Sequence, residues 1–254
     1  MKVVKKTLLS LWKMIPESHA KHGVRKGMMR FNSHPNRRFF VNPGDTVLQV
    51  GAMGAGIVEW SLSIVGPKGR VVVLEPDERN FEKLAASPLL KSEQVILKKL
   101  AAWSKREKLM LTVSHNPADN KIAVDDVLHD NDLVPDNYIH EQETQADTVD
   151  NILKSLDISH IDFAEIHVNG AELEVLKGME DTLPNTCRLH LKAHALVGDD
   201  KVPLNQPIKD FLNERGFKVV ITKTTVARTE AVSHGWTVRD GDLYAWNPSF
   251  KKRR

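Results

Sequence analysis

The chain has 254 residues, of which 41% are hydrophobic and 27% charged, a composition that excludes collagen-like, disordered and disulfide-rich chains. Its length is enough for one large α/β domain or two small ones. The net charge of +3 hides an uneven distribution, because residues 1–38 carry +9 and residues 251–254 carry +4, which leaves −10 for residues 39–250. Such asymmetry can indicate an anionic partner.

The charge pattern divides the chain near residue 38. Before this point we expect a basic, partly helical N-terminal segment, residues 1–38, and after it one main domain, residues 39–254. Residues 5–15 predict a short amphipathic helix, because their large apolar side chains share one stripe.

Beyond residue 38 the sequence alternates between strands and helices. The expected strands are 46–50, 70–74, 95–99, 108–113 (antiparallel), 162–168, 188–193, 217–222 and 243–246. The expected helices are 56–65, 78–86, 150–156, 171–180 and 206–215. Residues 115–146 are polar and irregular, and we expect a long loop or insertion there. This alternation is typical of a mostly parallel sheet that is covered on both faces.

The single cysteine, Cys187, excludes a disulfide within the chain and fits a reducing compartment. No apolar run approaches the ~20 residues that span a bilayer. The apolar run at residues 7–12 is interrupted by Lys13, and no small-residue cleavage site follows, so it does not read as a signal peptide. We therefore expect a cytoplasmic protein, and any membrane contact would be peripheral, at the inner face.

The most informative stretch is the glycine-rich turn that follows the expected strand 46–50. Gly51, Gly54 and Gly56 would let the backbone turn tightly and approach a ligand, and Glu75 ends the next strand, where a carboxylate can accept both ribose hydroxyls. This arrangement predicts nucleoside binding. The dinucleotide pattern G-x-G-x-x-G is not met, and the turn alone does not separate dinucleotides from S-adenosylmethionine. A turn that merely packs a helix against a strand also stays open.

Several segments together resemble a known family. They are residues 49–52, 66–71, 75–76, 80–81, 84, 100–104, 148–150, 166–178 and 194. Over roughly residues 40–246 the chain resembles the FkbM family of S-adenosylmethionine-dependent methyltransferases, and the segment 166–178 is the most distinctive match. The resemblance implies a doubly wound, mostly parallel seven-stranded sheet of the class I (Rossmann-like) methyltransferase type, with S-adenosyl-L-methionine as cofactor.

The resemblance also implies site residues. Those expected to bind the cofactor are Gln49, Gly51, Ala52, Gly54, Gly56, Glu75, Pro76, Ala101, Ala102 and Asn169. Methyl transfer from a sulfonium needs a positioned nucleophile and a base but no metal, so we expect no metal site. The expected catalytic residues are His167, whose unperturbed pKa of ~6.5 suits a general base, with Glu172 and His194 as further candidates. Structural interpretations also stay open: for His167, a satisfied polar residue at a strand end or a relic of a lost site, and for Glu172, charge complementarity at a helix N-terminus.

The chain departs from the family pattern at several polar positions. Gln49 and His167 each replace an aspartate and Asn169 a glutamate, while Ala55 replaces a glycine and Lys192 stands where glutamate is frequent. Gln49 can hydrogen-bond but supplies no charge to balance the amino group of the methionine moiety. A neutral hydrogen bond is weaker than a charge-assisted one by ~1 kcal/mol, so we expect reduced cofactor affinity.

The resemblance implies O-methylation of a hydroxyl group on a sugar, glycolipid or secondary metabolite. A second hypothesis is a degenerate, non-catalytic protein that binds a partner or a membrane surface, and a nucleic-acid methyltransferase is the least favoured. Three interpretations of the basic ends stay open: a membrane-surface anchor, nucleic-acid binding, or a segment that packs on the domain or is a solvated tail. Residues 8–15 could also cover the substrate crevice or form a dimer contact, and the oligomeric state is not predicted.

Overall fold

The computed structural model describes residues 41–52, 54–129, 138–193, 195–221 and 242–251. The predicted N-terminal segment, its boundary near residue 38, and the candidate His194 lie outside these residues. Most of the basic C-terminal stretch also lies outside them.

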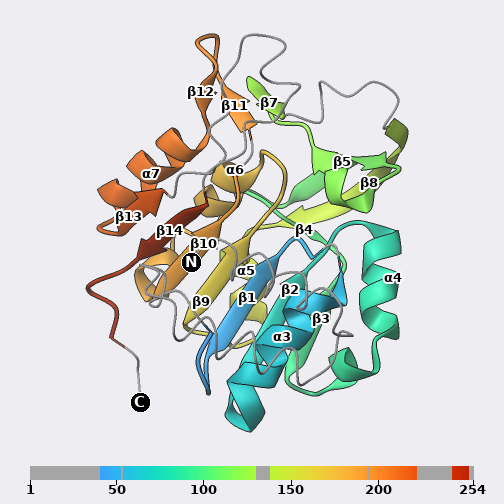
Figure 1. The fold of residues 1–254 in the computed structure, drawn as a ribbon, viewed down its shortest axis with the longest axis vertical. Helices are drawn as coiled ribbons and strands as arrows, with labels where there is room; N and C mark the ends of the chain where they lie inside the picture. Colours follow the sequence, from blue (N-terminus) through green and yellow to red (C-terminus); the bar gives the residue numbers. More distant parts are fainter. Residues whose placement is uncertain (1–40, 53, 130–137, 194, 222–241, 252–254) are drawn as a thin grey trace, which may run out of the picture. The chain divides into compact units, whose positions relative to one another are not determined.

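A seven-stranded sheet forms the centre of the domain (Figure 1). Its strands are β1 (Thr46–Val50), β2 (Arg70–Leu74), β3 (Val95–Lys98), β9 (Phe163–Ile166), β10 (Arg188–Leu191), β13 (Lys218–Ile221) and β14 (Leu243–Trp246). Their order is β13-β14-β10-β9-β1-β2-β3, and all pairs are parallel except those of β14 with β10 and β13. The expectation of a mostly parallel, seven-stranded sheet is confirmed.

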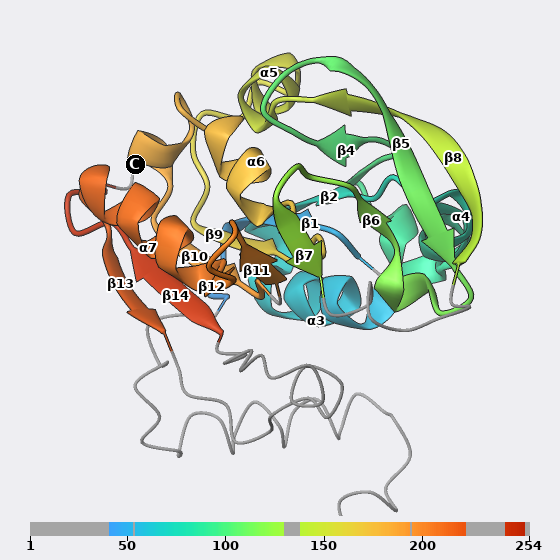
Figure 2. The same cartoon turned by 90° about the horizontal axis from the view of Figure 1, so that it is seen from above.

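Helices cover both faces of this sheet (Figure 2). α3 (Ala55–Val65) lies on one face, and α5 (Val149–Ser155), α6 (Glu172–Lys177) and α7 (Asn205–Glu214) lie on the other, while α4 (Glu78–Ala86) follows β2. The main core lies between α5, α6, α7 and the apolar side chains that β1, β2, β9 and β10 present to them. Short 3-10 turns occur at Gly66–Lys68, Pro88–Lys91, Pro117–Asp119 and Leu183–Asn185.

Two small sheets extend from the main one. One has the order β4-β8-β5-β6, from β4 (Ala101–Ala102), β5 (Glu107–Ser114), β6 (Lys121–Ile122) and β8 (Tyr138–Asp147). The other has the order β12-β11-β7, from β7 (Val127–His129), β11 (Ala195–Val197) and β12 (Val202–Pro203).

Residues 115–146 were expected to be irregular, as a long loop or insertion, and for residues 138–146 this was wrong because they form most of β8. β8 pairs antiparallel with β5 along most of its length, and pairs such as Lys108 with Glu143, at 2.8 Å between Nζ and Oε1, join the two strands. Most β8 side chains are exposed, so the strand lacks the alternation of apolar and polar residues that would reveal it. Pairing with β5, rather than burial, determines its conformation.

Gly178, the residue that follows α6, lies directly against the backbone of Trp103, which follows β4. A Cβ atom at this position would overlap the backbone carbonyl group of Trp103. Because backbone atoms cannot move aside as a flexible side chain can, only glycine fits where α6 ends.

We predict that Gly178→Ala lowers the free energy of unfolding by about 1–3 kcal/mol, the usual cost of overpacking. Urea denaturation of the full chain measures it. Gly56→Ala is the matched control, because a Cβ atom there meets nothing within 4 Å and alanine favours helix. Equal stabilities of the two variants would contradict the prediction.

Candidate active site

A cavity of about 380 Å³ opens at the carboxyl ends of β1, β2 and β9, where parallel α/β sheets bind ligands. Its size is within the roughly 300–1,000 Å³ of small-molecule sites. The apolar part of its wall includes Leu74, Leu111 and Ile122, and the polar part includes Glu75, Asn120 and His167. The residues that line it come from the main sheet and from the β5–β6 region.

The turn after β1 forms one wall of the cavity. Gly51 has a φ of 77°, which favours glycine, and a Cβ atom there would overlap the carbonyl group of His167. The two segments are held together because the His167 amide donates a hydrogen bond to the Val50 carbonyl, at 3.0 Å. Gly54 and Gly56 also line the cavity, and a Cβ atom at either would meet nothing within 4 Å. The turn therefore leaves open space beside its backbone.

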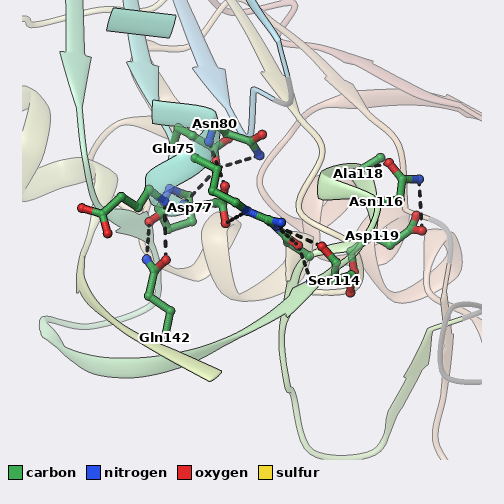
Figure 3. A network of polar contacts seen from close by, with 12 residues as sticks. Glu75, Asp77, Asn80, Ser114, Asn116, Ala118, Asp119 and Gln142 are labelled. Carbon is green, nitrogen blue, oxygen red and sulfur yellow. Dashed lines mark hydrogen bonds and ion pairs between the residues drawn. The ribbon is translucent and has the colours of Figure 1, made fainter. Parts of the chain in front are cut away.

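Glu75 joins this turn to the end of β2. Its Oε2 atom accepts a hydrogen bond from the Ala52 amide at 2.7 Å, and its Oε1 atom accepts one from the Asp77 amide at 3.0 Å. Figure 3 shows Glu75 grouped with Asp77 and Asn80, and Asp77 caps α4 by accepting from the Asn80 amide at 2.8 Å. Burial raises the pKa of Glu75 to about 7, against the lowering effect of these hydrogen bonds.

The loop after β5 lies over the cavity and is held there from two sides. Asn169, in the left-handed region with a φ of 52°, donates hydrogen bonds from Nδ2 to the carbonyl oxygens of Ala118 at 2.6 Å and Asn120 at 2.7 Å. From α4, Arg79 donates to the Ser114 carbonyl oxygen at 3.0 Å. Loop residues 117–118 and 120 line the cavity, so these contacts fix part of its wall.

The structure brings most of the expected site residues together. All ten residues expected to bind the cofactor line the cavity: Gln49, Gly51, Ala52, Gly54, Gly56, Glu75, Pro76, Ala101, Ala102 and Asn169. His167 lines it as well and is half-buried. Their roles remain predictions that the structure makes testable.

Glu172 lies elsewhere. It is fully buried and is not among the cavity-lining residues. Its carboxylate accepts hydrogen bonds from the backbone amides of Val168, at 3.0 Å, and Gly170, at 3.1 Å. Both contacts lie in the turn that carries His167 and Asn169, so this geometry makes Glu172 a residue that positions that turn.

Sequence reasoning missed some polar residues of the cavity, among them Glu165, Asn120 and Lys121. Lys192, noted only as a departure from the family pattern, also lines it. The sequence could have indicated Glu165, because side chains two residues apart on a strand point to the same side and His167 comes two residues later. Lys121 is half-buried, and burial lowers its pKa. Asn120 and Lys121 follow a loop whose course the sequence did not predict.

Together, the parallel sheet, the glycine turn and the buried carboxylate after β2 define a nucleoside-binding α/β domain. The methyltransferase FkbM domain family matches residues 49–219, and the chain belongs to this family. The expected family is thus confirmed, the fold is the class I methyltransferase type, and S-adenosylmethionine is the cofactor.

Among solved structures, a putative rRNA methylase from Clostridium thermocellum is similar at 12% identity and a TM-score of 0.46, over 84% of this chain and 92% of that one. Aeropyrum pernix fibrillarin with natively bound S-adenosyl-L-methionine is similar at 13% identity and a TM-score of 0.44, over 81% and 67%. A Thermotoga maritima S-adenosylmethionine-dependent O-methyltransferase is similar at 15% identity and a TM-score of 0.42, over 84% and 62%. No curated protein matches the chain.

The residues present fit this cofactor. The Asn80 Oδ1 and Asn120 Nδ2 atoms are buried without a hydrogen-bond partner, and both residues line the cavity. A nucleoside offers the hydroxyl donors and ring acceptors that such atoms need. Among the described residues, no three potential ligands are grouped to hold a metal ion. The same part of the chain contains no helix long and apolar enough to cross a membrane.

We predict that Glu75 makes stability depend on pH. Its pKa is about 7 in the folded protein and ordinarily 4.5, so between these values the folded state binds a proton that the unfolded chain does not. The contribution of Glu75 to stability therefore falls as pH rises from 4.5 to about 7. Relative to Glu75→Gln, the wild type should lose about 3 kcal/mol across this range.

Urea denaturation at several pH values measures this difference. The matched control is Glu82→Gln. Glu82 is exposed on the nearby helix α4, and its substitution should show no such trend. A constant difference between the wild type and Glu75→Gln would contradict the prediction.

We predict that Asn169→Gly releases the loop over the cavity. Glycine keeps the left-handed backbone without strain and removes the two hydrogen bonds to Ala118 and Asn120. Amide hydrogen exchange in residues 115–122 should accelerate about tenfold, as expected from losing ~1 kcal/mol or more of hydrogen bonding. Unchanged exchange in this segment would show that Asn169 does not hold the loop.

Proposed function

We propose that the chain transfers a methyl group from S-adenosylmethionine to a hydroxyl group of a small molecule or glycan, such as a sugar, glycolipid or secondary metabolite. The observation that carries the proposal is the position of His167, on the cavity wall and directly beside the glycine turn. A base at this position can reach an acceptor that enters the cavity. The cofactor, when bound, supplies an electrophilic methyl group.

His167 is the group best placed to take the acceptor's proton. Histidine is the side chain that most often serves as a general base near neutral pH. The turn that carries His167 is held in place by hydrogen bonds. Its backbone amide donates to the Val50 carbonyl oxygen, and the Glu172 carboxylate accepts hydrogen bonds from two further amides of the same turn. This rigidity supports a role that requires accurate positioning.

The polar wall around His167 supports a hydroxylated acceptor. Lys121 adds an ammonium group, which donates hydrogen bonds to the hydroxyl oxygens of sugars. A non-catalytic role is less well supported, because the replacements at Gln49, His167 and Asn169 all leave polar side chains on an open cavity.

We predict that His167→Ala lowers kcat about 10²–10⁴-fold, the usual worth of a general base. The affinity of the His167→Ala variant for S-adenosylhomocysteine, measured by calorimetry, should stay within about twofold of the wild-type affinity because no base is needed for binding. Turnover is measured as release of S-adenosylhomocysteine with a panel of monosaccharides and hydroxylated small molecules. His140→Ala, an exposed histidine of β8 that does not line the cavity, is the matched control.

Two results would count against the proposal. Absence of calorimetric binding of S-adenosylmethionine and S-adenosylhomocysteine at millimolar concentration would exclude the cofactor site. Full turnover in His167→Ala would exclude His167 as the base.

A further inference from the structure

Glu165 is a cavity-lining carboxylate that the methyl-transfer proposal does not use. It lies on β9, in register with Gln49 on β1, so the two side chains project from the same face of the sheet. Both residues line the cavity, and Glu165 is only 7% exposed. The negative charge that Gln49 lacks is therefore present one strand away.

The Glu165 carboxylate has weak partners within the described structure. Its Oε1 atom lies 3.7 Å from Lys192 Nζ and 3.9 Å from His190 Nδ1, both beyond hydrogen-bond distance. His190 has other contacts, because it stacks on Tyr244 and its Nε2 atom lies 3.3 Å from the Asp242 carboxylate. A buried carboxylate without strong hydrogen bonds is costly, and a donor that enters the cavity would relieve that cost.

Lys192 supplies the opposite charge beside it. It extends from the end of β10, lines the same cavity and is 28% exposed at its side chain. The cavity wall thus presents an anion and a cation side by side. An α-amino acid carries an ammonium and a carboxylate group separated by one carbon atom. Its positive group can therefore face Glu165 while its negative group faces Lys192.

We propose that Glu165 and Lys192 together bind the amino-acid end of the cofactor, Glu165 its ammonium group and Lys192 its carboxylate group. This inference rests on the proposed function. It assigns to Glu165 and Lys192 the recognition of the charged amino-acid end, which the neutral Gln49 cannot supply. It makes these two residues determinants of affinity for the methionine part and not for the nucleoside part.

Two ligands separate these parts in a calorimetric test on the full chain. S-Adenosylhomocysteine has the amino-acid end, and 5′-methylthioadenosine lacks it. Glu165→Gln and Lys192→Met should each weaken S-adenosylhomocysteine binding about tenfold or more, the scale of one charge-assisted hydrogen bond. Binding of 5′-methylthioadenosine should change less than about twofold.

Matched controls come from an exposed pair of the same residue types. Glu143→Gln and Lys108→Met break the ion pair between β5 and β8, whose side chains are 55% and 62% exposed and do not line the cavity. Both controls should bind the two ligands as the wild type does. The double variant Gln49→Asp with Glu165→Gln returns a carboxylate to the same register position and should recover most of the lost affinity.

The outcomes are distinct. Equal weakening of both ligands, or no weakening of either, overturns the inference while leaving the proposed function intact. A double variant that binds no better than Glu165→Gln also overturns it, because charge would then not be the cause. Absence of binding in the wild type overturns the proposed function and the inference with it.

Discussion

The site depends on one interaction: the hydrogen bond of 2.7 Å from the Ala52 amide to the buried Glu75 carboxylate. It links the turn after β1 to the end of β2, and the second Glu75 oxygen extends the link to Asp77 and the start of α4. The Ala52 amide, like the Gly51 amide that donates to the Leu74 carbonyl oxygen, is thus satisfied before any ligand arrives. The same carboxylate lines the cavity, so a group that stabilises the turn is also exposed to any ligand that enters.

The sequence predicted the central part of this arrangement well. Buried apolar runs ending in glycine or acid, as at Gly51 and Glu75, indicate strands and their carboxyl ends, because a parallel sheet must bury both faces. The chemistry of residues at those ends then follows from the fold. The family resemblance added that residues as far apart as Gln49 and Asn169 belong to one site, and both line one cavity.

Elsewhere the sequence was a poor guide, for physical reasons. β8 is stabilised by pairing with β5 and by exposed charges, so its polar sequence resembles a loop. From the sequence, Glu172 could equally be a catalytic carboxylate. Only its contacts with the Val168 and Gly170 amides reveal a positioning role. The position of Glu165 beside Gln49 could not be predicted, because it depends on the register between two strands more than one hundred residues apart.

The contacts of Asn169 with the loop over the cavity bear on the thermodynamics of ligand capture. Ordering a loop costs conformational entropy, at roughly 1–2 kcal/mol for each residue fixed. Here two short hydrogen bonds from Asn169 order the loop as the chain folds. Encounter with a ligand then incurs less of this entropy, because the wall it meets is already formed. The Asn169 contacts thus preorganise part of the cavity wall.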